Sequence, residues 1–306
     1  MNLLLSRMLA CADPTQVEGL SRFFKTGPGQ YGEGDKFLGI KVPVTREVVK
    51  GCWREMLPMD GRKGFPELEE CVCSEFHEVR LAALLTLVEI FKFAQKTEKK
   101  SKGATGKTEL ASGKTDITKS RLGGATETAG VPMTRQCVDF YLAHTKYINN
   151  WDLVDLSCYP LLGEWLLDKD RTLLYDLARN GKTLWEQRIG MVSTMTFIRH
   201  GQLEDTFAIA DILLHHPHDL IHKAVGWLLR EAGKKDKNAL EKYLKGFPAP
   251  DCTEIKKMSD KEGVGGKRTG CESAPRYQSM PRTMLRYAIE KFPEAERLAY
   301  LNGRAS

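Results

Sequence analysis

The chain has 306 residues, of which 42% are hydrophobic and 28% charged, and a formal charge of +6. This composition, with a mean hydropathy of −0.37, is ordinary for a globular protein of one long domain or two shorter ones. It contains no run of about 18 apolar residues, which argues against a membrane span. The positive charge is compatible with a polyanionic partner, although part of it lies in residues 96–127.

The first residues, MNLLLSRMLACADP, predict an amphipathic helix that ends near Asp13-Pro14. A signal peptide is disfavoured because Arg7 interrupts the apolar patch and no cleavage region follows. The eight cysteines are scattered, and only Cys71 and Cys73 lie close together. Without C-x-x-C pairs we predict no zinc site and a reduced, intracellular compartment, without distinguishing nucleus from cytoplasm.

Helical spacing of apolar residues dominates the chain, and no segment alternates as a strand does. Four segments open on a basic or polar residue and continue apolar: 77–89, 185–197, 221–232 and 281–292. Arg188 and Lys223 stand about 35 residues apart, which with two helices per unit is typical of HEAT-like repeats. We therefore predict an all-α superhelix, or solenoid, that forms a single domain over residues 1–306.

Two stretches interrupt this pattern, namely residues 95–131 and 249–279. The first is rich in Gly, Lys, Thr and Ser, and the second is similar. Such segments bury too little apolar surface to offset the entropy of ordering, so we predict two flexible insertions.

The histidine-rich segment HHPHDLIH, residues 215–222, raises the question of a metal site. Pro217 divides the segment, so we interpret it as a helix end followed by a helix start. We predict no metal there and no cofactor for the protein.

The segment INNWDLVDLS, residues 148–157, has the signature of a helix start. Asn149 or Asn150 can cap the helix, and Asp152 lies in a first turn that favours negative charge. Trp151 and Asp155 are four residues apart and so share one face. The positions that follow have core-like spacing: Leu156, Tyr159, Leu162 and Leu166.

The spacing of the unusual residues matches the repeat. About 37 residues separate Trp151 from Arg188, and about 39 separate Arg188 from Trp227. Residues one repeat apart occupy comparable heights on neighbouring helices, so these side chains, with Asp155, are candidates for one concave wall. Each has a structural alternative: packing for the two tryptophans, a helix-dipole partner for Asp155, and an inter-repeat ion pair for Arg188.

Several motifs resemble those of the DNA alkylation repair family, the AlkD-type DNA glycosylases. The resemblance covers most of the chain apart from the two insertions. It rests on RFFKTG, YGEGDKFLGIKVP, INNWDLVD, LWEQRIGMV, IHKAVGWLLREAGK and MPRTMLRYAIEKFP. One departure is Val42-Pro43, where the family often has Thr-Pro.

The resemblance implies a HEAT-like enzyme that removes N3- and N7-alkylated purines from duplex DNA without base flipping. It also implies roles for four residues: Asp155 as the catalytic carboxylate, Trp151 and Trp227 as walls around the deoxyribose, and Arg188 as a phosphate ligand. These residue types suit the reaction, because loss of a cationic base builds positive charge on the sugar, which a carboxylate stabilises.

Lys223 and Arg230 are predicted helpers of Arg188 in DNA binding. We expect a monomeric base excision repair enzyme, a monofunctional glycosylase whose partner is double-stranded DNA with alkylated purines, and no membrane association. The alternative is a HEAT-repeat DNA-binding or scaffold protein without catalysis, because a fold does not by itself establish an activity.

Overall fold

The computed structural model describes residues 2–57, 65–105, 131–246 and 274–305. These residues are mainly helical, and among them the β-type pairing is an isolated bridge between Lys36 and Phe76. The predicted all-α class is confirmed. The chain divides into two compact units, Met1–Trp165 and Leu166–Ser306. The single domain over residues 1–306 stays a prediction. Within the described ranges, no helix is long and apolar enough to cross a membrane.

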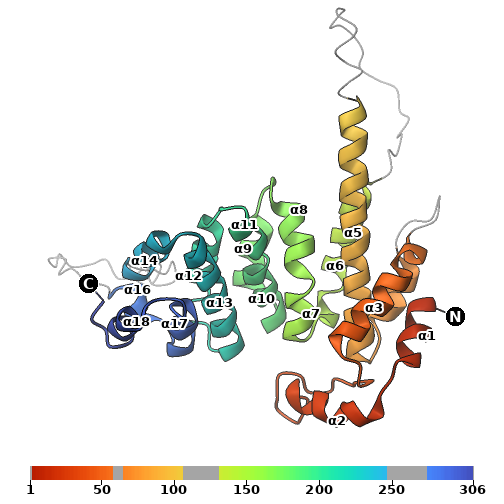
Figure 1. Cartoon of the computed structure of the whole chain (residues 1–306), viewed down its shortest axis with the longest axis horizontal. Helices are drawn as coiled ribbons and strands as arrows, with labels where there is room; N and C mark the ends of the chain where they lie inside the picture. Colours follow the sequence, from red (N-terminus) through yellow and green to blue (C-terminus); the bar gives the residue numbers. More distant parts are fainter. Residues whose placement is uncertain (1, 58–64, 106–130, 247–273, 306) are drawn as a thin grey trace, which may run out of the picture. The chain divides into compact units, whose positions relative to one another are not determined.

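The described residues of the first unit form α-helices (Figure 1) and shorter helical turns. Its helices are α1 (Leu3–Ala10), α2 (Pro14–Phe23), α3 (Val42–Cys52), α4 (Pro66–Val72), α5 (His77–Thr105), α6 (Met133–Ala143) and α7 (Trp151–Asp155). The turns are the 3₁₀ helices η1 (Trp53–Met56) and η3 (Thr145–Tyr147) and the π-helix η4 (Tyr159–Gly163). The short helix α8 (Glu164–Leu166) spans the boundary between the two units.

Helix α5 is the centre of the first unit, where it packs against α1, α3, α4, α6 and α7. All residues from 77 to 91 except Glu89 are buried. A helix that is apolar around most of its circumference requires neighbours on every side. This segment accordingly lacks the separate polar and apolar faces of a surface helix. The functional residues at its start are therefore held inside the unit.

The first helix is shorter than predicted. It ends at Ala10, and Asp13 instead caps α2, where its carboxylate accepts a hydrogen bond from the Thr15 N–H at 3.0 Å. Pro14 occupies the first position of α2, where its missing N–H and fixed φ cost nothing.

The first predicted insertion begins later than expected, because α5 continues to Thr105. The Glu98 carboxylate accepts hydrogen bonds from the backbone N–H and the hydroxyl of Thr134, at 3.1 and 2.9 Å, and so joins α5 to the start of α6. Residues 95–105 are thus helical, and residues 106–130 lie outside the described part of the chain.

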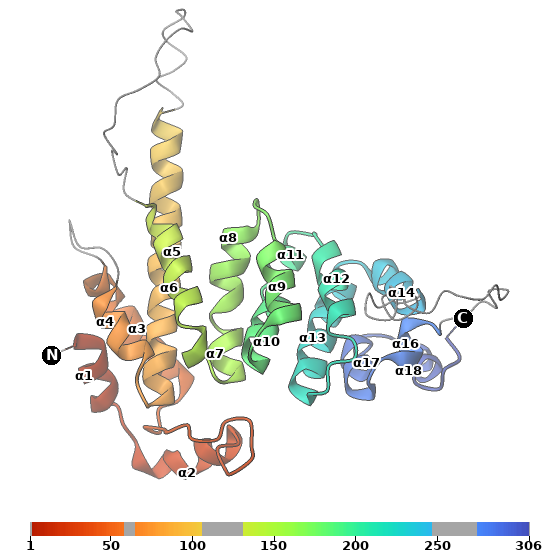
Figure 2. The same ribbon diagram turned by 180° about the vertical axis from the view of Figure 1, so that it is seen from behind.

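The second unit consists of helices α9 to α18 (Figure 2). They are α9 (Thr172–Asn180), α10 (Leu184–Val192), α11 (Met195–Arg199), α12 (Glu204–Ile212), α13 (Asp219–Lys235), α14 (Lys237–Lys245), α16 (Arg276–Ser279), α17 (Arg282–Ala288) and α18 (Glu294–Leu301). Helix α13 is its centre and packs against α10, α11, α12, α14 and α17.

Two glycines allow the helices of this unit to approach closely. A Cβ atom on Gly190 would lie 2.7 Å from the Leu174 carbonyl oxygen in α9, and one on Gly226 would lie 2.5 Å from that of Met284 in α17. No side chain fits at these distances. The glycines of R-I-G and A-V-G-W are therefore packing requirements, and they fix the helices that carry Arg188 and Trp227.

The second predicted insertion also ends earlier than expected. Arg276 in α16 forms a bidentate ion pair with Asp211, with N–O distances of 2.6 and 2.7 Å, and Tyr277 is buried. Residues 276–279 are thus part of the fold, whereas residues 247–273 lie outside the described ranges.

Candidate active site

Helix α7 carries one predicted indole, Trp151, at its first residue and the predicted carboxylate, Asp155, at its last. Asn150 caps the helix, as predicted, and its side-chain oxygen accepts a hydrogen bond from the Trp151 N–H at 2.9 Å. Asp152 is buried and accepts a hydrogen bond from the Leu153 N–H, also at 2.9 Å. Trp151 and Asp155 are both partly exposed, so this five-residue helix presents them from a fixed backbone.

Helix α7 ends at Asp155, whereas the sequence pattern suggested one helix continuing to Leu166. A turn and the π-helix η4 follow, with Pro160 near its start. Proline has no N–H to donate, so the regular α-helical ladder is interrupted at this point, and π-helical turns are frequent at functional sites. The interruption leaves Leu156 and Tyr159 partly exposed rather than in the core.

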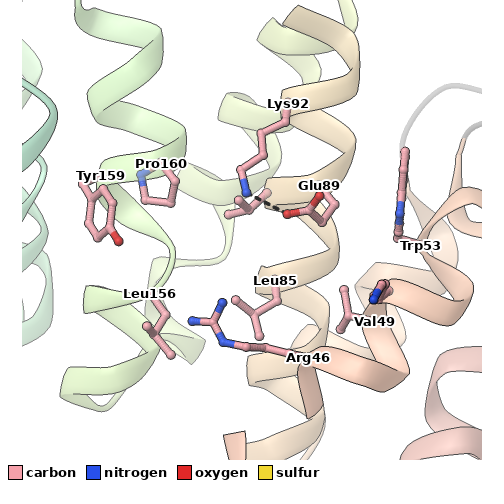
Figure 3. Close-up of a pocket in the computed structure, with 11 residues that line it drawn as sticks. Arg46, Val49, Trp53, Leu85, Glu89, Lys92, Leu156, Tyr159 and Pro160 are labelled. Carbon is pink, nitrogen blue, oxygen red and sulfur yellow. Dashed lines mark hydrogen bonds and ion pairs between the residues drawn. The ribbon is translucent and has the colours of Figure 1, made fainter. Parts of the chain in front are cut away.

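These two residues line a cavity of about 420 Å³ in the first unit (Figure 3). The floor is apolar and includes Val49, Leu85 and Val88, while exposed basic side chains surround it. The cavity is lined by Arg46, Val49, Lys50, Trp53, Leu85, Val88, Glu89, Lys92, Leu156, Tyr159 and Pro160. One of the lining residues, Leu156, directly follows Asp155 in the chain. A basic and aromatic surface therefore adjoins the candidate catalytic helix.

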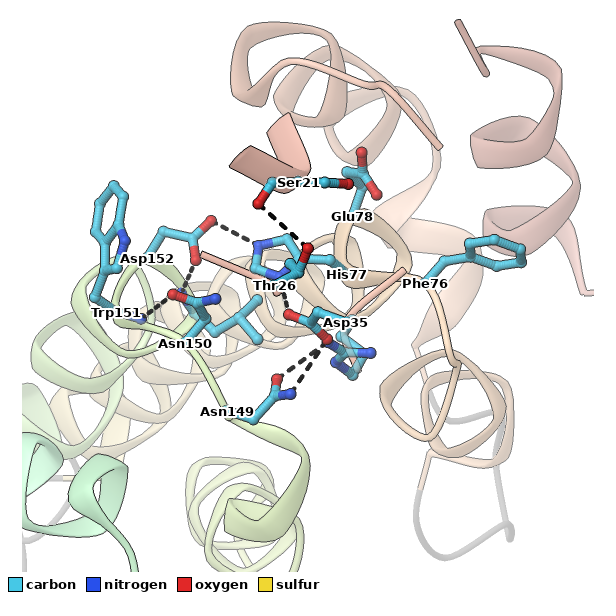
Figure 4. Close-up of polar contacts among 12 residues, drawn as sticks. Ser21, Thr26, Asp35, Phe76, His77, Glu78, Asn149, Asn150, Trp151 and Asp152 are labelled. Carbon is cyan, nitrogen blue, oxygen red and sulfur yellow. Dashed lines mark hydrogen bonds and ion pairs between the residues drawn. The ribbon is translucent and has the colours of Figure 1, made fainter. Parts of the chain in front are cut away.

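A buried histidine lies beneath the start of α7 (Figure 4). The ring of His77 contacts Asp152 Oδ2 through Nε2 and Asp35 Oδ2 through Nδ1, each at 2.9 Å. Carboxylates only accept hydrogen bonds, so both ring nitrogens donate and His77 is an imidazolium. Burial alone lowers its pKa, but the bonds with Asp152 and Asp35 outweigh this effect and raise the pKa to about 9.

Two further groups complete this buried network around Asp35. Arg80 donates to both Asp35 and Asn149, and the Asn149 amide donates to Asp35 at 3.2 Å. Burial alone raises the pKa of Asp35, but the His77 hydrogen bond and the charge of Arg80 lower it below its ordinary value. Two cations thus face two carboxylates, which compensates the cost of burying each charge.

The adjacent residue, Glu78, holds the F-L-G-I segment in place. Its buried carboxylate accepts backbone N–H bonds from Leu38, Gly39 and Ile40 at 2.9, 2.9 and 3.0 Å. Gly39 has φ +86°, and a Cβ there would lie 1.9 Å from the Asp13 carbonyl oxygen. The backbone of the F-L-G-I segment can therefore adopt this conformation only with glycine at position 39.

Trp151 packs against two phenylalanines from the end of α2. Its ring stacks on Phe24 at 5.4 Å, and the edge of Phe23 meets it at 5.9 Å. Phe23 is 61% exposed, so an aromatic side chain beside Trp151 is accessible at the surface. Sequence reasoning assigned Phe23 no role, although it lies in the RFFKTG motif.

In the second unit, Arg188 is buried, with 5% of its surface exposed. Its Nη1 donates to the Leu220 carbonyl oxygen at 2.6 Å, which joins α10 to the start of α13. The alternative predicted for Arg188, an ion pair between repeats, stays a prediction beside this bond to the backbone.

The other candidates of the second unit lie on α13. Trp227 is half-buried, and Lys223 forms an ion pair with Asp219 at 2.8 Å. Arg230 is bound by Glu290 and by Glu231, the latter at 3.4 Å. These partners compete with a phosphate, so the predicted DNA contact of Arg230 requires the exchange of an existing ion pair.

The histidine-rich segment is a helix boundary, as predicted. Helix α12 ends at Ile212 and α13 begins at Asp219, with Pro217 between them. His218 caps α13, where its Nδ1 accepts a hydrogen bond from the Leu220 N–H at 3.1 Å.

The predicted residues are divided between the units. Trp151 and Asp155 belong to the first, and Arg188, Trp227 and the two basic helpers to the second. The first set lies on the single helix α7 and the second on the neighbouring helices α10 and α13. The single concave wall stays a prediction. The sequence motifs contained Asp35, His77 and Asp152, but nothing in their spacing indicated that they meet.

The described residues form an all-α fold in which the candidate site residues lie on α7, α10 and α13. The model of the DNA alkylation repair enzyme family matches residues 4–292, and the chain belongs to this family. This confirms the resemblance seen in the motifs and gives the chain a role in DNA alkylation repair.

Comparison with solved structures supports the fold. The chain is similar to one described as "Predicted DNA alkylation repair enzyme from Enterococcus faecalis", with a TM-score of 0.52 and 14% identity over 83% of this chain and 98% of that chain. At this identity the likeness concerns the fold alone. No curated protein matches the chain.

Proposed function

We propose that the protein is a monofunctional DNA glycosylase that excises N3- and N7-alkylated purines from duplex DNA without base flipping. The observation that supports this most is helix α7, on which Trp151 and Asp155 are partly exposed and which is anchored through Asp152 to a buried charge network. A rigid, accessible carboxylate beside an indole suits a site that stabilises positive charge.

The chemistry of the substrate explains this requirement. An alkylated purine is cationic and departs as a neutral base, so its glycosidic bond breaks with positive charge developing on the deoxyribose. Asp155 stabilises that charge and orients the attacking water. The face of Trp151 attracts the same charge, which contributes about 0.5–2 kcal/mol. Trp227 has the same role in this proposal, and Arg188 binds a backbone phosphate.

The test is release of 7-methylguanine from methylated duplex DNA by the full chain. We expect free base and an abasic strand, with release proportional to enzyme. Tight binding of the duplex without base release would contradict the glycosylase and favour a DNA-binding protein without catalysis.

Arg188→Ala is expected to weaken binding to an unmodified duplex and to make the slope of log affinity against log salt shallower by about 0.9, because one phosphate contact is lost. The variant also loses the bond to the Leu220 carbonyl, so its free energy of unfolding should fall by about 1–3 kcal/mol. Titrations at several salt concentrations and thermal melts measure the two effects. A reduced stability with an unchanged salt slope would restrict Arg188 to a structural role. The variant Arg188→Lys keeps the positive charge but loses the bidentate geometry of the guanidinium, so it shows which of the two the phosphate contact requires.

The exposed basic residues at the cavity, Arg46 and Lys50, are expected to contact phosphates as well. The double variant Arg46→Ala/Lys50→Ala should make the salt slope shallower by about two units with an unchanged melting temperature, since both side chains are exposed. The matched control is Lys99→Ala/Lys100→Ala, which removes the same charge from the exposed surface of α5 beyond Lys92. Equal slopes for the two double variants would remove the cavity from the DNA interface.

A further inference from the structure

The imidazole of His144, at the end of α6, is oriented by its surroundings. Its ring lies against Phe140, with centroids 4.2 Å apart, and against Tyr147, with centroids 6.2 Å apart. Its Nδ1 donates to the Phe140 carbonyl oxygen at 2.7 Å, and the side chain is 9% exposed. This bond places a proton on Nδ1 and directs Nε2 outward, an arrangement typical of metal-binding histidines.

Two ligand-type side chains face that nitrogen, Glu69 from α4 and Cys73 from the residue that follows this helix. Glu69 Oε1 lies 2.9 Å from His144 Nε2, and Cys73 follows Glu69 by four residues, one helical turn. The nitrogen, a carboxylate oxygen and the thiol sulfur all lie within 4.8 Å of one another. An imine nitrogen and a carboxylate oxygen at 2.9 Å repel unless a cation lies between them, either a proton or a metal ion.

We propose that Glu69, Cys73 and His144 form a zinc-binding site that joins α4 to the end of α6. Zinc takes thiolate, imidazole and carboxylate ligands, and three protein ligands with a water complete a tetrahedron. Ligand atoms of such a site lie roughly 3.3–3.8 Å apart. The cluster reaches this spacing by rotation of Glu69 and Cys73, both exposed, toward the fixed imidazole. The thiolate and imidazole favour zinc over magnesium or calcium.

From the sequence we predict no zinc site, because the chain has no C-x-x-C pair. In the structure the nearby Cys71 is fully buried and takes no part in the cluster. The exposed Cys73 instead lies beside a histidine 71 positions away in the chain. Among the described residues, Glu69, Cys73 and His144 form the group of three side chains whose ligand atoms lie close enough to share a metal ion. The histidines of residues 215–222 do not form another such group.

Cobalt titration of the full chain tests the site, because thiolate-bound Co²⁺ has a charge-transfer absorption. The parent carries Cys252→Ser and Cys271→Ser, which remove the two cysteines outside the described residues. We expect one equivalent of Co²⁺ to produce the band, Zn²⁺ to displace it and Ca²⁺ to leave it unchanged. Zn²⁺ should also raise the melting temperature of the parent, since it binds the folded state.

Variants distinguish this site from other thiols. Cys73→Ser should abolish the band and the zinc-induced rise in melting temperature. Glu69→Gln removes a direct carboxylate ligand, so it should weaken Co²⁺ binding at least roughly 10-fold, the lower end of the loss typical of an outer-shell partner. The matched control is Cys11→Ser, a partly exposed cysteine after α1, which should retain both effects. Because Glu69 and Cys73 are both exposed, these variants should fold. No band at saturating Co²⁺, or a band that persists in Cys73→Ser, would overturn the proposal and leave a His144–Glu69 ion pair.

Discussion

Asp155→Asn is expected to slow release of alkylated purines on the order of 10²–10³-fold while leaving duplex affinity close to that of the parent. Asparagine keeps the shape of the side chain but loses the negative charge that the developing sugar cation requires. The loss should therefore appear in the rate of base release at saturating enzyme, and not in binding. Single-turnover release of 7-methylguanine, with affinity measured on the same duplex, provides both quantities.

The matched control is Asp176→Asn, which removes an exposed carboxylate from α9. It changes the net charge by the same amount, so it corrects for a general gain in affinity for DNA. Nearly equal release by the parent and Asp155→Asn would remove this residue from the mechanism. Equal losses in Asp155→Asn and Asp176→Asn would show that the effect is one of net charge.

The sequence predicted the parts of the fold that depend on local pattern. Apolar spacing predicted the all-α class, and the Asn-Asn-Trp-Asp run predicted the start of α7 with Asn150 as its cap. Such features depend on neighbours within one or two turns. The end of α7 was not predicted, because Leu162 and Leu166 continue the apolar spacing through the interruption at Pro160.

Composition was a weaker guide to helix length. Residues 95–105 look too polar for a core, but they continue a helix whose earlier turns are already buried, and adding residues to an existing helix costs little. The bond from Glu98 to the start of α6 could not be predicted, because the two residues are 36 apart with an insertion between them.

The sequence could not predict the buried network either, because its members are far apart in the chain. Asp35, His77 and Asp152 come from a loop and two helix starts, and each has an ordinary interpretation on its own. The network appears only when α5 is buried on all sides and brings its first turn beneath α7. The sequence therefore indicated which segments matter, while tertiary packing decides which side chains position Asp155.

His77→Gln is expected to lower the free energy of unfolding by about 3–5 kcal/mol, because two buried carboxylates lose the cation between them. The double variant His77→Gln/Asp152→Asn should recover part of this loss, because the Arg80–Asp35 ion pair remains and no uncompensated buried charge is left. Denaturant unfolding at pH 7 measures both. The control is His200→Gln, an exposed histidine of the second unit, which should change stability little.

The same network predicts how stability depends on pH. The pKa of His77 rises from 6.5 to about 9 on folding, which corresponds to about 3 kcal/mol. A raised pKa means that the folded state holds the proton more tightly. This contribution is therefore complete below pH 6.5 and is lost as the pH rises through about 9. We expect the parent to lose stability between these values and His77→Gln to show a flatter profile. Parallel profiles for the two proteins would show that His77 carries no charge in the folded state, and the account of how α7 is held would then be wrong.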